Sequence, residues 1–383
     1  MIDLDLTHPA ITDLARTAKA RLPRFVWEYL DSGTGADRTR DANRASLDAV
    51  TLTPRVLRGH AAPDLSVTLM GREQALPFGI APVGMSGLMR GDGEITLARA
   101  AAAHAIPYGL STVAAATPEQ LAPHIGAQGW FQLYPPRDPV IRRDLLARAA
   151  GAGFHTLILT ADVATASRRE RQRRARLTNP MRFTPRVIVD AALHPAWAID
   201  RLRHGIPRLA TLDPYADTAA SRGGTEHAGY MLRTAPDMDY LAALRDEWDG
   251  KLVVKGILHA DDAAMVAPLC DAVWVSNHGG RQFDAAPAPA TVLPAIRAAL
   301  GPGAQILVDG GVASGTDILR YLALGADFVM SGRAFHHGLA AFGAAGVDHA
   351  IHILRASLEA DMGQLGLARL ANLPPIYAPA PLP

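Results

Sequence analysis

The sequence predicts an α/β protein whose chain folds into a (β/α)8 TIM barrel, with one long insertion after the fourth strand. Short apolar or β-branched runs that end in polar residues or glycine occur eight times along the 383 residues. Segments rich in alanine and leucine, with helical periodicity, lie between most of these runs, and this alternation is typical of a parallel sheet. Eight such units are the number that closes a barrel.

The predicted strands each include the polar or glycine residues that close the run. In chain order they span Pro77–Gly84, Ile106–Thr112, Gly129–Tyr134, Thr156–Asp162, Lys251–Gly256, Ala272–Asn277, Gln305–Gly311 and Phe328–Arg333. Helical periodicity is clearest at Glu94–His104, Arg143–Ala150 and Ala290–Leu300. The strand spacing is broken once, so residues 163–250 are predicted to form an insertion within a single domain of residues 1–383. In a barrel this insertion lies on the face that carries the active site.

An open, doubly wound sheet is the alternative to the barrel. Such a sheet usually carries a glycine-rich dinucleotide-binding loop after its first strand. The corresponding segment here, Gly84–Met85–Ser86–Gly87, does not have the spacing of that loop. The barrel is therefore favoured.

The composition is that of an ordinary globular protein and limits its partners. Hydrophobic residues make up 49% and charged residues 20%, which excludes a disordered chain. The 38 Lys and Arg residues balance 37 Asp and Glu residues, so a small-molecule partner is expected and nucleic acid is not. Cys270 is the single cysteine, which excludes an internal disulfide and fits a reducing compartment. No signal peptide or spanning helix is indicated, so the protein is expected to be cytoplasmic or attached to a membrane face.

The ends of the predicted strands carry chemically active side chains. Catalytic groups of barrel enzymes sit at the carboxyl ends of the strands. The candidates there are Ser111, Gln132, Tyr134, Thr160, Asp162, Lys255, Ser276, His278, Asp309 and Arg333. Charges that converge on one rim are costly to desolvate unless they are paired or bind a ligand. The glycines of Asp309–Gly310–Gly311 and Ser331–Gly332–Arg333 let backbone N–H groups approach a phosphate, so a phosphorylated cofactor or substrate is predicted.

The densest motif follows the sixth strand. It reads Ser276–Asn277–His278–Gly279–Gly280–Arg281–Gln282–Phe283–Asp284. A histidine three residues before an arginine places a base beside a cation that binds a carboxylate with two parallel hydrogen bonds. This arrangement suits a hydroxy acid.

The motif resembles the signature of the FMN-dependent 2-hydroxy acid dehydrogenase/oxidase family, which includes glycolate oxidase, flavin-type L-lactate dehydrogenase and (S)-mandelate dehydrogenase. Phe283 stands where leucine is usual. The resemblance continues through Leu22–Pro23, Ala81–Pro82–Val83–Gly84, Trp130–Phe131–Gln132–Leu133–Tyr134, Leu252–Val253–Val254–Lys255–Gly256 and Ala323–Leu324–Gly325–Ala326. It implies FMN as cofactor, oxidation of a lactate- or mandelate-like (S)-2-hydroxy acid to the 2-oxo acid, a quinone or other external electron acceptor, no metal ion, and a homo-oligomer, with a tetramer expected.

The resemblance also implies a role for each matching residue. The backbone of Pro82, Val83 and Gly84 and the side chains of Ser111, Gln132, Thr160, Lys255 and Ser276 would surround the flavin ring and ribityl chain. The tail and phosphate would be bound by Asp309, Gly310, Gly311, Gly332 and Arg333. A cation such as Lys255 near the N1–O2 edge of the ring stabilises the negative charge that accompanies reduction.

The same resemblance assigns the substrate side of the site. Arg169 and Arg281, with Tyr29, would bind the substrate carboxylate, and Tyr134 would donate a hydrogen bond near the substrate oxygen. His278 would be the base. Asp162 would orient the imidazole, and this pairing is expected to raise the pKa of His278.

The chain departs from the family pattern at two places. Val312–Ala313–Ser314 stands where two arginines commonly follow Gly-Gly-Val, so one usual phosphate-binding side chain is absent. The loss of one charge-assisted hydrogen bond lowers affinity roughly ten- to hundredfold if nothing compensates. Val113 and Ala166 replace bulkier side chains of the glycolate-preferring members, so a larger substrate is expected.

The predicted insertion combines basic and apolar residues. Arg168 to Arg176 holds six arginines, and Val187–Ala198 is an apolar run that includes Trp197. This combination predicts a segment at a membrane interface, with the protein peripheral on the inner face of the cell membrane. His194–Pro195–Ala196–Trp197 resembles the corresponding segment of the membrane-associated members. A mobile surface lid with solvated arginines is the alternative.

Three other functions compete with the dehydrogenase. An oxidase of the same chemistry would return electrons to O2 and form H2O2. An FMN-dependent isomerase of the type 2 isopentenyl diphosphate isomerase kind would need a diphosphate clamp in place of Arg169 and Arg281. A barrel that only binds ligands would show no substrate-dependent bleaching of flavin. One cysteine excludes a Cys-x-x-Cys-His haem site, so a cytochrome partner would be a separate protein.

Overall fold

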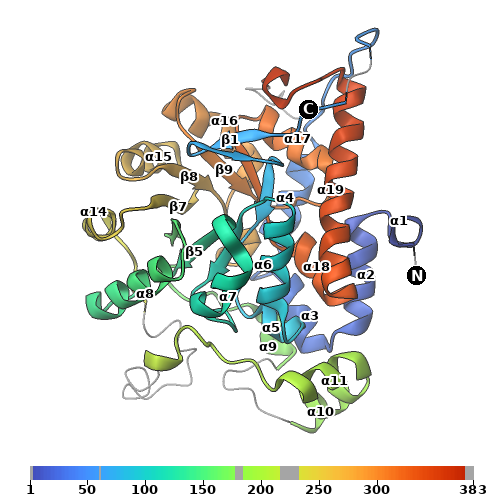
Figure 1. Ribbon diagram of the computed structural model, residues 1–383, viewed down its shortest axis with the longest axis vertical. Helices are drawn as coiled ribbons and strands as arrows, with labels where there is room; N and C mark the ends of the chain where they lie inside the picture. Colours follow the sequence, from blue (N-terminus) through green and yellow to red (C-terminus); the bar gives the residue numbers. More distant parts are fainter. Residues whose placement is uncertain (1–2, 60–61, 177–183, 216–232, 376–383) are drawn as a thin grey trace.

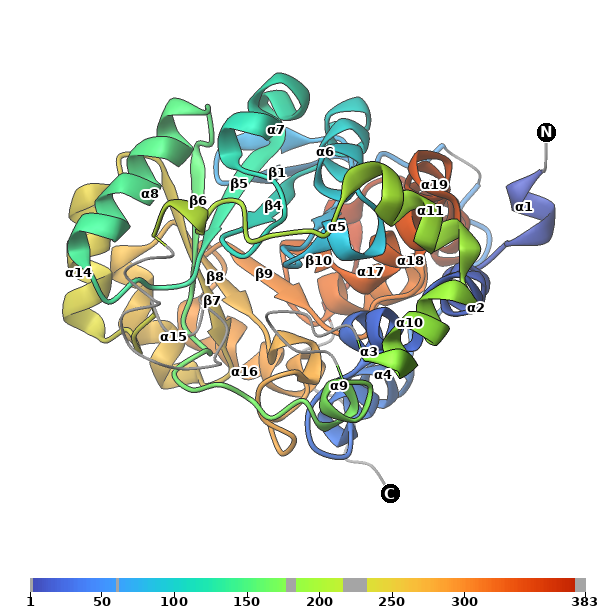
Figure 2. The same ribbon diagram turned by 90° about the horizontal axis from the view of Figure 1, so that it is seen from below.

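The computed structural model describes residues 3–59, 62–176, 184–215 and 233–375. Eight parallel strands close into a barrel in the order β10-β3-β4-β5-β6-β7-β8-β9 (Figures 1 and 2). They are β3 Phe78–Ile80, β4 Tyr108–Ser111, β5 Gly129–Leu133, β6 Thr156–Thr160, β7 Lys251–Ile257, β8 Ala272–Val275, β9 Ile306–Asp309 and β10 Phe328–Ser331. Each strand coincides with one predicted run, so the predicted barrel is confirmed.

The barrel strands are apolar on both faces because both faces are buried. One set of side chains fills the interior, which includes Trp130, Ile158, Val253 and Trp274. The neighbouring residues in sequence point outward to the helices, because successive side chains of a strand alternate between its faces. The result is a packed core with the site at one end.

Helices surround the barrel and cover its ends. The surrounding helices are α6 Gly93–Ala103, α7 Pro118–Ile125, α8 Pro139–Gly151, α14 Met238–Glu247, α15 Ala260–Val266, α16 Pro289–Leu300, α17 Gly315–Ala323, α18 Arg333–Phe342 and α19 Ala344–Leu365. The remaining helices are α1 Leu4–Thr7, α2 Ile11–Arg21, α3 Arg24–Asp31, α4 Arg38–Asp48, α5 Ser86–Met89, α9 Glu170–Arg174, α10 Pro185–Ala192 and α11 Pro195–His204. Short 3-10 turns lie at Gly126–Gln128, Asp213–Tyr215, Ala267–Leu269, His278–Gly280 and Leu370–Asn372. The three clearest predicted helices coincide with α6, α8 and α16.

A hairpin closes the amino end of the barrel. Its strands, β1 Val67–Leu69 and β2 Arg72–Gln74, pair antiparallel. Leu69 is 1% exposed and packs against the residues of the barrel interior. Figure 1 shows this hairpin and the α10–α11 pair at opposite ends of the molecule. The insertion helices therefore lie at the carboxyl end of the strands.

The apolar run at Val187–Ala198 forms most of α10 and the start of α11. Trp197 was expected at a membrane interface, but its side chain is buried, and that expectation is wrong for this residue. Its ring packs edge-on against Phe25 at 5.5 Å, and its Nε1 donates a hydrogen bond to the Leu88 carbonyl oxygen at 2.8 Å. Trp197 thus anchors α11 to the protein.

Candidate active site

One pocket of about 1350 Å³ lies at the carboxyl ends of the barrel strands. Small-molecule pockets commonly measure about 300–1,000 Å³, so this one has room for more than one small ligand. The predicted site residues that line it are Tyr29, Pro82, Val83, Gly84, Gln132, Tyr134, Thr160, Arg169, Lys255, His278, Arg281, Asp309, Gly310, Gly311, Gly332 and Arg333. The three others, Ser111, Asp162 and Ser276, form hydrogen bonds with residues of this set.

A row of neutral side chains joins three adjacent strand ends. Ser111 Oγ donates a hydrogen bond to Gln132 Oε1 at 2.8 Å, and Gln132 Nε2 donates one to Thr160 Oγ1 at 2.9 Å. All three residues are at most 2% exposed. Ser111 and Gln132 are also direct partners in the β4–β5 register. The row holds the Gln132 amide in one orientation at the floor of the pocket.

Lys255 places a fixed positive charge in this floor. Its Nζ donates a hydrogen bond to Ser276 Oγ at 2.7 Å and lies 3.3 Å from Asp309 Oδ2. Ser276 Oγ in turn donates to Asp309 Oδ1 at 2.7 Å. A buried ion pair is retained at a cost in desolvation, which its hydrogen bonds offset. The lysine is therefore held in place before any ligand binds.

His278 and Asp162 form a hydrogen-bonded pair at the rim. His278 Nδ1 lies 3.0 Å from Asp162 Oδ1, and its Nε2 lies 3.5 Å from Tyr134 Oη. Gly256 leaves room for Asp162, because a Cβ at position 256 would come within 2.6 Å of the Asp162 Cβ, and its φ of +108° favours glycine. With Nδ1 on the carboxylate side, Nε2 is the ring nitrogen nearer to Tyr134.

The net pKa of His278 is lowered, although the pairing with Asp162 raises it as expected. Burial lowers this pKa most, and the positive charges of Lys255 and Arg169 lower it further. The Asp162 carboxylate raises it but does not outweigh these causes. Burial alone would raise the pKa of Asp162, but the charges of His278 and Lys255 hold it below its ordinary value. The neutral imidazole is the form that accepts a proton.

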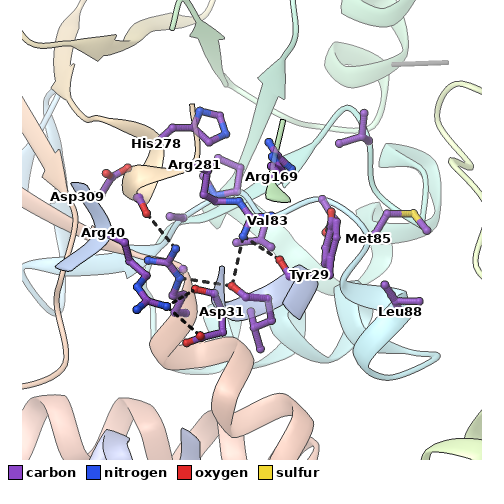
Figure 3. A pocket seen from close by; sticks show the side chains of 18 of the residues that line it. Tyr29, Asp31, Arg40, Val83, Met85, Leu88, Arg169, His278, Arg281 and Asp309 are labelled. Atoms are coloured by element: carbon purple, nitrogen blue, oxygen red, sulfur yellow. Dashed lines mark hydrogen bonds and ion pairs between the residues drawn. The ribbon is translucent and has the colours of Figure 1, made fainter. Parts of the chain in front are cut away.

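Two guanidinium groups face the same pocket. Arg281 Nη1 donates to the carbonyl oxygens of Tyr29, at 2.8 Å, and Ser32, at 3.1 Å, near the end of α3. Arg169 Nε donates to Ser167 Oγ at 3.1 Å, and the φ of Arg169 is +45°. Figure 3 shows Arg169, Arg281 and His278 gathered at one side of the pocket. Positive charge and a base are thus brought together.

Comparison with known proteins gives the family. A sequence model described as FMN-dependent dehydrogenase matches residues 18–378. The chain belongs to the FMN-dependent dehydrogenase family. An L-lactate dehydrogenase of Caulobacter vibrioides is 40% identical over 367 residues, which cover 94% of this chain and 95% of that protein. The (S)-mandelate dehydrogenase of Pseudomonas putida is 35% identical and covers 96% of this chain and 93% of its own. The crystal structure of the monotopic membrane protein (S)-mandelate dehydrogenase matches with a TM-score of 0.89 and 34% identity, covering 96% and 98% of the two chains.

The pocket of this FMN-dependent dehydrogenase fits its cofactor. FMN requires hydrogen-bonding groups around the ring. The side chains of Ser111, Gln132 and Thr160 supply such groups. It also requires a phosphate site, and the glycine loops end at Arg333, the first residue of α18. A helix N-terminus preceded by glycine binds phosphate through backbone N–H groups. Arg333 Nη2 donates to the Gly279 carbonyl oxygen at 2.9 Å, which fixes its guanidinium beside this loop.

Sequence reasoning missed part of the pocket of this dehydrogenase. Arg40 and Arg44 of α4 and His337 of α18 also line it. The four-residue spacing of Arg40 and Arg44, which places two cations on one helix face, was the available signal. In the part of the chain that the structure describes, no group of three or more His, Cys, Asp or Glu side chains is placed to hold a metal ion.

Proposed function

We propose that this FMN-dependent dehydrogenase oxidises an (S)-2-hydroxy acid to the corresponding 2-oxo acid. The observation that carries the proposal is the placement of the His278–Asp162 pair beside two arginines in one pocket. A carboxylate substrate needs such cations, and a hydroxyl group that loses its proton needs such a base. The relatives named L-lactate dehydrogenase and (S)-mandelate dehydrogenase support this substrate class.

Each side chain then has a defined task. Arg169 and Arg281 bind the substrate carboxylate, with the Tyr29 hydroxyl near them. His278 Nε2 accepts the substrate proton, and Asp162 stabilises the imidazolium that forms. Tyr134 donates a hydrogen bond to the substrate oxygen. FMN, when bound, would supply the oxidising ring that takes up two electrons and the second hydrogen of the substrate. Lys255, held by Ser276 and Asp309, stabilises the negative charge that develops beside it.

The substrate is larger than glycolate. Val113 and Ala166 both line the pocket, and both side chains are small. Each additional methylene that the substrate buries contributes about 0.8 kcal/mol. Lactate or a larger aliphatic or aromatic hydroxy acid, such as mandelate, should therefore have the higher kcat/KM.

Anaerobic mixing of the holoenzyme with single hydroxy acids tests the reaction. The flavin absorbance should bleach with (S)-lactate or (S)-mandelate and bleach more slowly with glycolate at equal concentration. The R enantiomers are the matched control. Absence of bleaching with every acid would overturn the proposal, whereas glycolate as the best substrate would overturn only the argument from pocket size.

An external acceptor, such as a membrane quinone, takes the electrons. The support is an exposed face on α10, α11 and the residues that follow. The large apolar side chains that are about half exposed or more in this segment are Ile188, Val189, Leu193, Ile199, Leu202 and Ile206. We call these six residues the apolar face. Exposed apolar clusters of this kind mark sites of protein or membrane contact.

Basic residues border the apolar face. Arg186, Arg203 and Arg208 are all exposed, as in an interfacial helix that contacts anionic headgroups. The related mandelate dehydrogenase is described as a monotopic membrane protein. No described helix is long and apolar enough to span a bilayer. We infer peripheral attachment to the inner face of the cell membrane, and the expected tetramer stays a prediction.

A peroxide assay separates this dehydrogenase from an oxidase. With a soluble quinone present in air, pure enzyme should turn over far faster than with O2 alone and should form far less than one H2O2 per 2-oxo acid. One H2O2 per turnover would favour the oxidase instead. The isomerase and the ligand-binding barrel lose their support because the family match covers most of the chain.

A further inference from the structure

Arg40 faces the end of the pocket that carries the glycine loops, as Arg333 does. Arg40 lies in the first turn of α4 and lines the pocket together with Gly279, Gly311 and Arg333. The helix is pressed against these loops, because a Cβ on Gly280 would come within 2.5 Å of the Arg40 backbone nitrogen. This packing against the Gly280 loop therefore fixes the position of the Arg40 backbone.

The Asp31 carboxylate pairs with Arg40 and Arg171 and also lies near Arg333. Arg40 Nη1 lies 3.0 Å from Asp31 Oδ2, and Figure 3 shows the two side chains pointing toward each other. Burial raises the pKa of Asp31, but a hydrogen bond from Arg171 and the charges of Arg40 and Arg333 hold it below its ordinary value. Burial lowers the pKa of Arg333 most; the charge of Arg40 lowers it further, and that of Asp31 raises it. Two like charges thus lie close together beside the same space.

Arg44, which follows Arg40 by four residues on α4, is held by two carboxylates. Arg44 donates to both oxygens of Asp317 at 2.6 Å, and to both oxygens of Asp48 at 2.5 and 3.0 Å. These carboxylates hold its guanidinium toward α17. Arg40 also pairs with Asp37 and Asp41, but its side chain is only 24% exposed and lies on the pocket wall.

A dianion between Arg40 and Arg333 would contact two guanidinium groups. A phosphate monoester carries about −1.5 to −2 charges at pH 7, and one guanidinium balances only about half of this charge. Ala313, which also lines this end, offers no charged group. We propose that Arg40 binds the FMN phosphate from the α4 side, opposite Arg333. It thereby replaces, from a different element, the cation missing at Ala313 and Ser314.

Comparison of two flavins tests this assignment without any substrate. Riboflavin has the ring and ribityl chain of FMN but lacks the phosphate. The apoprotein, prepared by removing FMN from the purified holoenzyme, should be titrated with each flavin while flavin fluorescence is followed. Arg40→Ala should raise the Kd of FMN about 10- to 100-fold, the effect of one charge-assisted hydrogen bond. The Kd of riboflavin should stay within about twofold of wild type, because the lost bond is made only to phosphate.

Arg38→Ala is the matched control, because Arg38 is exposed and lies on the same helical turn. It should leave both Kd values unchanged. Arg40→Lys keeps the charge and should recover part of the FMN affinity. Arg40→Gln, which removes the charge but keeps much of the side chain, serves if Arg40→Ala does not fold. The deciding quantity is the ratio of the riboflavin Kd to the FMN Kd. A fall of at least about fivefold in Arg40→Ala, or in Arg40→Gln if only that variant folds, supports the proposal, and any smaller change overturns it.

Discussion

His278 combines a strained backbone with a buried ring. Its φ is +58°, a region that residues other than glycine rarely adopt. Such conformations cost about 1–3 kcal/mol and persist where the surrounding structure enforces them, often at functional sites. Here the turn between Asn277 and Gly280 enforces it, since Asn277 Oδ1 accepts a hydrogen bond from the Gly280 N–H at 3.1 Å. The turn directs the imidazole toward Asp162.

The first prediction concerns the base. His278→Gln should retain FMN but slow anaerobic flavin reduction by about 10²–10⁴-fold, because loss of a general base commonly has this effect. Stopped-flow absorbance measures the rate, and the ratio of flavin to protein absorbance measures cofactor content. A variant that reduces its flavin at nearly the wild-type rate would show that His278 is not the base.

The second prediction follows from the lowered pKa of His278. The base acts when neutral, so kcat/KM should rise with pH through a midpoint below about 6.5, the ordinary imidazole value. In Asp162→Asn the carboxylate no longer raises the pKa of His278, so the midpoint should move to still lower pH. The maximal rate should fall at the same time, because the imidazolium loses its partner. A midpoint that moves to higher pH would contradict this account.

At the scale of elements, the insertion has two sides with different tasks. Trp197 and Leu209 are buried, whereas the side chains of the apolar face are about half exposed or more. Replacing residues 187–210 with a flexible linker would remove both sides at once, and with them part of the pocket lining. Substitutions confined to the apolar face separate attachment from catalysis.

The third prediction uses such substitutions. The triple variant Ile188→Gln/Leu193→Gln/Leu202→Gln should lose most binding to anionic vesicles, because it removes apolar area worth about 25 cal/mol per Å² buried. Flavin reduction by substrate should be unchanged. The control is Leu6→Gln/Val56→Gln, which changes two residues, each 80% exposed, that lie elsewhere. Co-sedimentation measures the binding.

Salt supplies a further check on the same experiment. Wild-type binding should weaken as salt shortens the Debye length to about 8 Å at physiological ionic strength, and neutral vesicles should bind less. A wild-type protein that stays in the supernatant with anionic vesicles at low salt would identify the insertion as a lid without membrane contact.

The barrel strands could be predicted from sequence because burial on both faces leaves a continuous apolar run. The β1–β2 hairpin could not, since its strands are three residues each and show little periodicity. Most of the site residues follow strand ends and were predicted for that reason. Arg40 was missed because its place depends on α4 packing against Gly280, a contact between distant parts of the chain. The direction of the His278 pKa shift likewise depends on burial, which the motif alone does not give.

At the scale of the whole molecule, the net charge of +1 conceals an uneven distribution. Basic residues gather around the pocket and the apolar face, and carboxylates such as Asp31 and Asp37 balance those nearest the glycine loops. The barrel supplies a rigid floor, the amino-terminal helices supply one wall, and the insertion supplies the other. Each wall comes from a part of the chain outside the barrel strands.

The insertion borders the same pocket that binds substrate. Ile206, Pro207 and Leu209 line it together with Arg169 and His278. A 2-oxo acid still bound there would obstruct an acceptor that approaches from this side, so the two half-reactions should alternate. Steady-state rates measured at several concentrations of hydroxy acid and quinone should give parallel double-reciprocal lines, the signature of a ping-pong mechanism. Intersecting lines would mean that acceptor and product are accommodated together.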